Sequence, residues 1–322
     1  MTSASPRSTA EAQYCIRQSS GIQEASDHTR LLDGWGLTYE QLSRGRFQGS
    51  LNEAWIEGVH LYQETLAQSV FQTGAMRQGC ISLGVFASLS GEARWFGKPV
   101  TIDDVIFLDS GGELLLSTPK HSTLLVLCLP HPRFTESTER RELHHFVHHP
   151  ALAQVLRRQI GQALGQLLTQ PLRFSRESAR RLFCADMQNL ADDCLRVASG
   201  APLDACRGRA IQVVHRAMDY MHERRGEMVS IDSLCSATYT SRRNLQKSFV
   251  KVTGESPAQF LKAQRLNGVR RDILNAPAGR MIGDIAIDWG FWHVSQFSVD
   301  YKRLFGESPS DTVQYARYRK LS

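Results

Sequence analysis

The sequence SRRNLQKSFVKVTGESP at residues 241–257 is followed by HVSQFSVDYKRLFGESP at residues 293–309, which repeats its pattern. Both segments end in Gly-Glu-Ser-Pro, and this tetrapeptide recurs after 52 residues. With the same offset, Leu245 aligns with Phe297, and an aromatic residue follows four positions later in each copy. Apolar residues four positions apart lie on one face of a helix. The repeat therefore predicts a helical unit that occurs twice.

The residues before each copy extend the repeat once a single residue is inserted in the turn. Leu234 then aligns with Ile285, and Cys235 aligns with Ala286. Each copy thus comprises a short apolar helix, a turn and a second helix. This is the layout of a helix-turn-helix motif.

Capping and stop residues mark the ends of these expected helices. Ser230 and Ser241 are the expected N-caps of the two helices in the first copy. Pro257 and Pro309 each follow a second helix and are expected to stop it. Residues 256–274, between the copies, predict one further helix that would fix the distance between the two motifs.

The second helix of the first copy carries several long polar side chains. Because Leu245, Phe249 and Val252 are expected to point inward, these polar side chains are free to point outward. Such donors hydrogen-bond to guanine or adenine edges and to phosphates. The residues are Arg242, Arg243, Gln246 and Lys247.

Charge is distributed unevenly along the 322 residues, whose net charge is +6. Residues 207–322 hold 19 of the 38 Lys and Arg residues but only 11 of the 32 Asp and Glu residues, a balance of +8. Basic side chains release the counterions that condense around phosphates, so this excess is typical of a polyanion-binding module. Arg270 and Arg271 are expected to be solvated helix charges.

The N-terminal two thirds have a different pattern. Within residues 46–130, short apolar runs such as CISLGVFA and STLLVLCL alternate with Gly, Asp, Ser and Pro, which favours an antiparallel sandwich or barrel. Helical spacing follows after residue 132. We predict an α+β protein of two domains: a β-rich, cupin-like barrel with appended helices over residues 41–200, and an all-α double helix-turn-helix domain over residues 206–320. Residues 1–40 are expected to form an N-terminal arm.

One of the appended helices carries a long apolar stripe. The stripe is longer than is needed to cover a single β-domain, so we predict that this helix packs against the same helix of a second chain in a homodimer. The alternative is that the stripe closes the underside of the β-domain. Its members are Leu182, Met187, Leu190, Cys194 and Val197.

The composition predicts a cytoplasmic protein with no membrane association. The longest dense apolar run, residues 124–129, is far too short to span a bilayer, and the polar N-terminus lacks a secretory signal. Seven cysteines without a C-x-x-C pair argue against a disulfide framework and a cysteine zinc site, so we expect reduced thiols.

Residues from about 207 to 319 resemble the DNA-binding domain of the AraC/XylS family of transcription regulators. The resemblance rests on D-I-A-x-x-x-G-F at Asp284–Phe291 and on S-R-R-x-L-Q at Ser241–Gln246. The run G-F-W-H, with Gln296 and Phe297, is similar to the ethanolamine-operon regulator branch of that family. Further matching residues are Ser295, Phe297, Tyr301, Lys302 and Phe305.

The resemblance implies that two recognition helices enter successive major grooves of double-stranded DNA. It also implies an activator of nearby or global operons that acts as a dimer with RNA polymerase as a partner. Arg243, Gln246 and Lys247 take the base-facing positions of the first recognition helix. The family often has Arg where this chain has Val299, so the first unit is expected to supply most base discrimination. The DNA-binding residues expected in the second helix are Val294, Ser295, Gln296, Ser298 and Val299.

Other functions are less well supported by the sequence. Four histidines at 144, 145, 148 and 149 would have the i,i+4 spacing of a zinc site on a helix, but no nearby motif completes that site and Pro150 is expected to break the helix. There is no G-x-S-x-G, P-loop or G-x-G-x-x-G motif. We therefore expect no catalytic residue, metal or cofactor.

Two alternatives stay open alongside a regulator. One is an architectural DNA-binding protein without an effector, and the other is a cupin-type metal enzyme fused to a DNA-binding domain. The large, acidic-leaning N-terminal part favours sensing or dimerisation over both alternatives. A small-molecule effector is accordingly a candidate partner, whose identity the sequence does not give.

Overall fold

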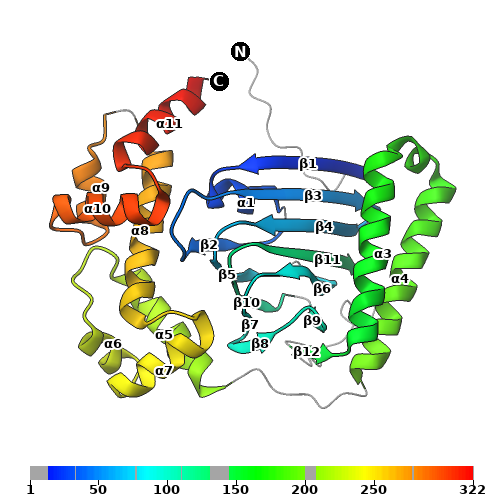
Figure 1. Ribbon diagram of the computed structural model, residues 1–322, viewed down its shortest axis with the longest axis horizontal. Helices are drawn as coiled ribbons and strands as arrows, with labels where there is room; N and C mark the ends of the chain where they lie inside the picture. The colour runs from blue at the N-terminus through cyan, green and yellow to red at the C-terminus, as the bar shows by residue number, and fades with distance from the viewer. Residues whose placement is uncertain are drawn as a thin grey trace.

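The computed structural model describes residues 14–32, 34–76, 78–109, 111–130, 145–199, 208–277 and 279–321. These residues form a domain of two β-sheets with appended helices, followed by a helical domain that packs against it (Figure 1). No helix in these residues is long and apolar enough to cross a membrane. The predicted fold class, a β-rich domain joined to an all-helical one, is confirmed.

Both sheets of the β-domain pair all their neighbouring strands antiparallel. The seven-stranded sheet contains, in spatial order, β1 (Tyr14–Ile22), β3 (Gly49–Ile56), β4 (Val59–Leu66), β11 (Ser122–Pro130), β6 (Cys80–Leu89), β9 (Asp104–Leu108) and β12 (His145–His148). The five-stranded sheet contains β2 (Thr38–Gln41), β5 (Val70–Ala75), β10 (Glu113–Thr118), β7 (Ala93–Trp95) and β8 (Lys98–Val100).

The two sheets face each other across an apolar core. Side chains alternate between the two faces of a strand, so every second residue points inward. Tyr62 and Val126 from the larger sheet, and Trp95 and Leu116 from the smaller one, are at most 4% exposed and belong to this core. Helices cover the outer face of each sheet.

Helices α3 (Pro150–Thr169) and α4 (Glu177–Ser199), joined by the short η1 (Pro171–Ser175), cover the outer face of the seven-stranded sheet (Figure 1). Cys194 and Met187 of the predicted stripe are 0% and 5% exposed within this cluster, whereas Leu182 is 60% exposed. The stripe is therefore not surplus to the needs of its own chain. Its buried members pack within their own chain, and packing of α4 against a second copy stays a prediction that now depends on the exposed Leu182.

The described part of the expected N-terminal arm belongs to the β-domain instead. β1 pairs with β3 at the edge of the larger sheet, β2 pairs with β5, and α1 (Ala25–Leu31) lies between them in sequence. The edge strand β1, YCIRQSSGI, has no fully buried residue, and its sequence has little apolar alternation. That pattern explains why periodicity missed it.

Two of the four clustered histidines, His145 and His148, lie in a strand and not on the helix that a zinc site with i,i+4 spacing would need. His148 lies in β12, which pairs with β9, and its Nδ1 is 2.9 Å from Oδ1 of Asp104. His149 is the N-cap of α3 and accepts a hydrogen bond at Nδ1 from the backbone N–H of Leu152, at 3.1 Å. His144 lies outside the described residues. Within the described ranges, no three His, Cys, Asp or Glu side chains are grouped to hold a metal ion.

The helical domain contains both helix-turn-helix units that the repeat predicts. The first is formed by α6 and α7, the second by α9 and α10, and α8 is the single helix expected between them. The bounds are α5 (Arg209–Glu223), α6 (Ile231–Ala237), α7 (Arg242–Thr253), α8 (Pro257–Asn275), α9 (Ile282–Asp288), α10 (Val294–Phe305) and α11 (Pro309–Leu321).

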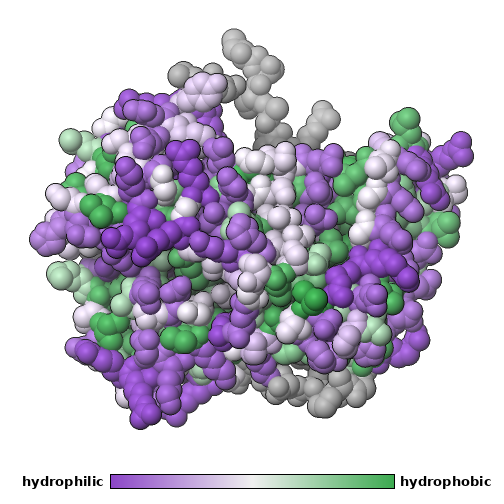
Figure 2. All heavy atoms as spheres, in the orientation of Figure 1, coloured by the Kyte–Doolittle hydropathy of each residue, from purple (hydrophilic) through white to green (hydrophobic). Residues whose placement is uncertain are grey.

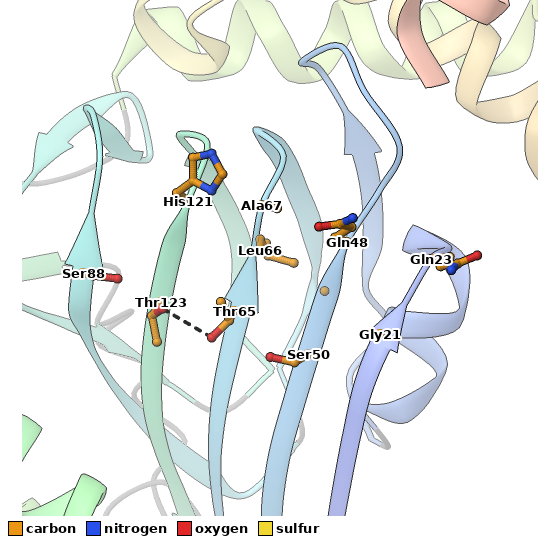
Figure 3. Close-up of a pocket in the computed structure, with 11 residues that line it drawn as sticks. Gly21, Gln23, Gln48, Ser50, Thr65, Leu66, Ala67, Ser88, His121 and Thr123 are labelled. Carbon is orange, nitrogen blue, oxygen red and sulfur yellow. Dashed lines mark hydrogen bonds between the residues drawn. The ribbon is translucent and has the colours of Figure 1, made fainter. Parts of the chain in front are cut away.

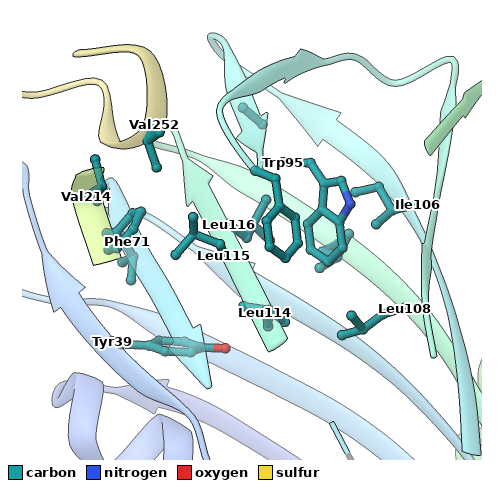
Figure 4. Close-up of a cluster of buried hydrophobic side chains, with 14 of the residues drawn as sticks. Tyr39, Phe71, Trp95, Ile106, Leu108, Leu114, Leu115, Leu116, Val214 and Val252 are labelled. Carbon is teal, nitrogen blue, oxygen red and sulfur yellow. The ribbon is translucent and has the colours of Figure 1, made fainter. Parts of the chain in front are cut away.

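The helical domain docks on the outer face of the five-stranded sheet. Val214 of α5 and Val252 of α7 join Phe71 and Leu115 of that sheet in one hydrophobic cluster (Figure 4). The ring of Phe71 also meets that of Phe260 in α8, edge to face, with centroids 5.2 Å apart. The two domains therefore share a continuous core, which the sequence did not predict.

Polar contacts along α8 complete the interdomain interface. Asn267 forms two hydrogen bonds with the backbone of Gln41, at 3.1 and 3.0 Å. Arg270 binds both carboxylate oxygens of Glu24, at 2.6 and 2.7 Å, and Arg271 bonds to Glu40 at 3.1 Å. Arg270 and Arg271 are therefore interdomain contacts rather than the solvated charges that the sequence predicts.

Candidate nucleic-acid interface

The first helix-turn-helix unit begins at a complete capping box. The hydroxyl of Ser230 accepts the N–H of Ser233 at 3.0 Å, and the hydroxyl of Ser233 accepts the N–H of Ser230 at 2.9 Å. The hydroxyl of Ser241 caps α7 by accepting the N–H of Asn244 at 3.3 Å. Both expected N-caps are confirmed: Ser230 caps α6, and Ser241 fixes where α7, the recognition helix, starts.

Helix α7 has a buried face and an exposed polar face. Leu245 and Phe249 are 0% exposed and Val252 is 1% exposed, so the apolar stripe anchors the helix. The guanidinium of Arg242 lies 2.9 Å from Asp232, but both side chains are more than two thirds exposed, so this pair contributes little to stability. The opposite face exposes all four predicted residues: Arg242, Arg243, Gln246 and Lys247.

The recognition helix of the second unit, α10, presents a less polar face. Phe297 and Tyr301 are buried at 1% and 0% exposure. Val294 and Val299 are 47% and 52% exposed, and Ser295 and Gln296 are exposed beside them. Ser298 is half-buried, and its hydroxyl donates to the carbonyl of Val294 at 3.0 Å, which makes it the least available of the predicted residues.

Both recognition helices end at a glycine in the left-handed conformation. Gly254 caps α7 with φ 82°, and Gly306 caps α10 with φ 72°. Such a cap suits glycine because it has no Cβ. Pro257 and Pro309 do not stop these helices, as the sequence predicts, but are the first residues of α8 and α11.

Helix α8 spaces the two units. Its 19 residues span roughly 28 Å at 1.5 Å per residue, a length comparable to one turn of B-DNA at ~34 Å. Trp289, at the end of α9, packs directly against α8, where a Cβ at Gly268 would lie 2.3 Å from its ring. Trp289 also donates from Nε1 to Asp272 at 2.7 Å. These contacts fix the second unit on the linker helix.

A buried charge cluster lies behind the second unit, at the interdomain interface. Besides Glu24, Arg270 contacts Glu307 at 2.9 Å and the hydroxyl of Tyr301 at 3.3 Å. Burial raises the pKa of Glu24, although the hydrogen bond and charge of Arg270 oppose that shift. Burial likewise raises the pKa of Tyr301 to about 12. The cluster ties the β-domain to the helix that carries the second recognition surface.

The helical domain and the outer sheet face differ in the side chains they offer to a ligand. Hydrophilic residues gather over the helical domain on the face shown in Figure 2. A groove of about 630 Å³ opens on the seven-stranded sheet, and its lining contains no Lys or Arg (Figure 3). The polar residues that line it are Gln23, Gln48, Ser50, Thr65, Ser88, His121 and Thr123. The cationic side chains needed for phosphate lie instead on α7.

Two exposed aromatic residues in the turns are missed by the sequence analysis. Tyr239, between α6 and α7, is 84% exposed, and Trp292, between α9 and α10, is 56% exposed. Helical periodicity gives no signal for either residue because both lie in turns. Each is within two residues of the N-cap of its recognition helix.

Two helix-turn-helix units joined by one linker helix define a bipartite domain of the DNA-binding class. A family model described as a helix-turn-helix domain matches residues 234–315. The chain is similar to the XylDLEGF operon transcriptional activator of Pseudomonas putida, with 32% identity over 104 residues, which is 32% of each chain. It is also 29% identical over 104 residues to a putative AraC-like transcription regulator of Streptomyces antibioticus, covering 32% of this chain and 34% of that one.

Among solved structures, the chain is similar to a probable AraC family transcriptional regulator from Rhodopseudomonas palustris. The identity is 29% and the TM-score 0.30, over 32% of this chain and 96% of the other. The matched region spans about a third of the length of the curated relatives. Residues 234–315 of this chain therefore form a helix-turn-helix domain, and this region is similar to the matching part of XylDLEGF and AraC-like transcription regulators.

Proposed function

We propose that this protein is a sequence-specific DNA-binding transcription regulator. The observation that carries the proposal is the exposed polar face of α7, where Arg242, Arg243, Gln246 and Lys247 stay accessible while the opposite side of the domain is docked on the β-domain. Long donors on the exposed face of a recognition helix can reach base edges in the major groove. The bound DNA would therefore lie on the side of the helical domain away from the β-sheets.

The two units contribute unequally to recognition in this proposal. Arg243, Gln246 and Lys247 would bond to base edges and phosphates under the first unit. Val294 and Val299 cannot donate hydrogen bonds, although a valine can contact a thymine methyl group. Ser295, Gln296 and Ser298 supply the shorter polar contacts of the second unit. Base changes under the first unit should therefore cost more affinity than those under the second.

Binding of the full chain to DNA fragments selected from a random pool tests the proposal. Replacing Arg243 or Gln246 with Ala should lower affinity for the selected site by about 1–3 kcal/mol, or roughly 5- to 150-fold, and relax preference at one base pair. Arg181→Ala is the matched control, because Arg181 is exposed on α4, far from the recognition helices in sequence. Unchanged affinity and selectivity in both test variants would refute the assignment.

The remaining partners belong to the same proposal. We infer a cytoplasmic homodimer that activates transcription in contact with RNA polymerase and responds to a small-molecule effector bound by the β-domain. Dimerisation is supported by effective concentration, since linking two DNA-binding domains raises affinity without new contacts. Calorimetric titration with candidate metabolites distinguishes a sensor from an architectural DNA-binding protein, which would give no heat with any of them.

A further inference from the structure

The turn of the first helix-turn-helix unit holds a tyrosine in a backbone conformation that suits glycine. Tyr239 has φ 50°, in the left-handed region. When the first helices of the two units are aligned through Leu234 and Ile285, Tyr239 corresponds to Gly290, whose φ is 77°. The second unit therefore has a glycine at this left-handed turn position, where a Cβ is unfavourable, whereas the first unit has a tyrosine.

Among the described residues, no buried apolar contact or side-chain hydrogen bond compensates for this strain. The side chain of Tyr239 is 84% exposed, so it gains little from apolar burial. The only hydrogen bond described for this residue is from its backbone N–H to the carbonyl of Ser236, at 3.2 Å, and its hydroxyl has none among the described residues. A residue in a strained conformation that gains no stabilising contact within the fold is a candidate for a binding role.

The position of Tyr239 gives that role a location. The residue lies two positions before Ser241, the N-cap of α7, and three and four positions before Arg242 and Arg243. The N-terminal end of a recognition helix is the part that approaches DNA, and the preceding turn lies beside the sugar-phosphate backbone. A tyrosine hydroxyl is among the groups that donate to phosphate oxygens.

We propose that Tyr239 is a DNA-backbone contact: its hydroxyl donates a hydrogen bond to a phosphate oxygen at the edge of the groove that α7 enters. This inference rests on the proposed function. Because phosphates are the same at every base pair, the contact strengthens binding to cognate and non-cognate DNA alike. It also explains why a glycine, the better residue for the turn itself, is absent from this position.

The other left-handed residues that are not glycine provide a control. Phe96 is buried and Glu57 pairs with Arg180 at 2.9 Å, so neither isolates the effect of backbone strain. His121, in the turn between β10 and β11, has φ 50° and is exposed. It therefore matches Tyr239 in conformation and exposure but lies in the β-domain.

The test compares Tyr239→Phe, Tyr239→Gly and His121→Gly in the full chain, with the melting temperature and the affinity for two duplexes as readouts. One duplex carries the selected site and the other a scrambled sequence of the same length. Tyr239→Phe keeps the turn and the ring but loses the hydroxyl. It should leave the melting temperature unchanged and weaken binding to both duplexes by about tenfold, the effect of one hydrogen bond to a charged group.

The two glycine variants separate strain from binding. Both should raise the melting temperature by relieving the left-handed residue, but only Tyr239→Gly should weaken DNA binding. A Tyr239→Phe variant that binds both duplexes as tightly as the native chain overturns the proposal, as does one that loses affinity for the selected site alone. A native chain that binds neither duplex refutes the proposed function itself, so the two failures are distinguishable.

Discussion

Replacement of Arg270 with Met tests how strongly the two domains are held together. The side chains of Arg270, Glu24 and Glu307 are 12%, 3% and 13% exposed, and the guanidinium bonds to both carboxylates. Removing one partner of a buried ion pair typically costs about 3–5 kcal/mol, because the other charge is left uncompensated. We expect Arg270→Met to lower the free energy of unfolding by about this amount at neutral pH.

The loss in free energy of unfolding caused by Arg270→Met should become smaller as the pH falls. Burial raises the pKa of Glu24 and Arg270 opposes this, so without Arg270 the folded-state pKa of Glu24 rises further above its ordinary value of 4.5. A carboxyl group whose folded-state pKa is raised favours the folded state below its unfolded pKa, and this contribution is lost as the pH rises through the folded-state value. The variant should therefore regain stability relative to the native chain as the pH falls toward 4.5.

Urea unfolding followed by tryptophan fluorescence measures the effect. Arg181→Met is the control, because Arg181 pairs with Glu177 on the surface of α4, with side chains 74% and 62% exposed, and such pairs contribute about 0–1 kcal/mol. The double variant Glu24→Gln with Arg270→Met should recover part of the loss, since it leaves one fewer buried carboxylate. An Arg270→Met variant within 1 kcal/mol of the Arg181→Met control would refute the reasoning.

Two further predictions concern DNA affinity and assembly. Val299→Arg should raise the affinity for DNA, because it adds one phosphate contact. The slope of the logarithm of the association constant against the logarithm of the salt concentration should become steeper by about 1. Fluorescence anisotropy across a salt series measures both quantities, and an unchanged slope with unchanged affinity would disprove the prediction. Sedimentation at micromolar concentration should show a dimer that Leu182→Glu, at 60% exposure on α4, converts to a folded monomer, while Leu172→Glu, at 82% exposure on η1, leaves it intact. A native chain that is monomeric with and without DNA contradicts the dimer.

The sequence predicted the helical units well because their signals are local. Capping serines, apolar residues four apart and the repeated tetrapeptide all act within one motif, so Ser230, Ser241 and the buried Leu245 could be assigned from the sequence alone. The interdomain interface has no such signal. Gln41 and Asn267 are 226 residues apart in the chain, and nothing in either neighbourhood marks them as partners.

Burial within a helix was only partly predictable for a related reason. The stripe on α4 has the right spacing, but spacing does not tell whether a helix packs on its own chain or on a second copy. Met187 and Cys194 are buried against the β-domain of the same chain. The left-handed conformation of Tyr239 in the turn before α7 could not be predicted either, because hydrophobic periodicity carries no information on the backbone conformation of a single turn residue.

The interdomain contacts also change the meaning of the charge excess in the C-terminal third. Its balance of +8 predicts polyanion binding, yet part of it is matched inside the protein by carboxylates of the β-domain. Such pairs are formed before any DNA is bound, so they release no counterions on binding and add nothing to its salt dependence. The number of phosphates contacted should therefore be set by the exposed cations of α7 and its neighbours, not by the net charge. The arginines already matched are Arg270, Arg271 and Arg319, with Glu24, Glu40 and Asp27.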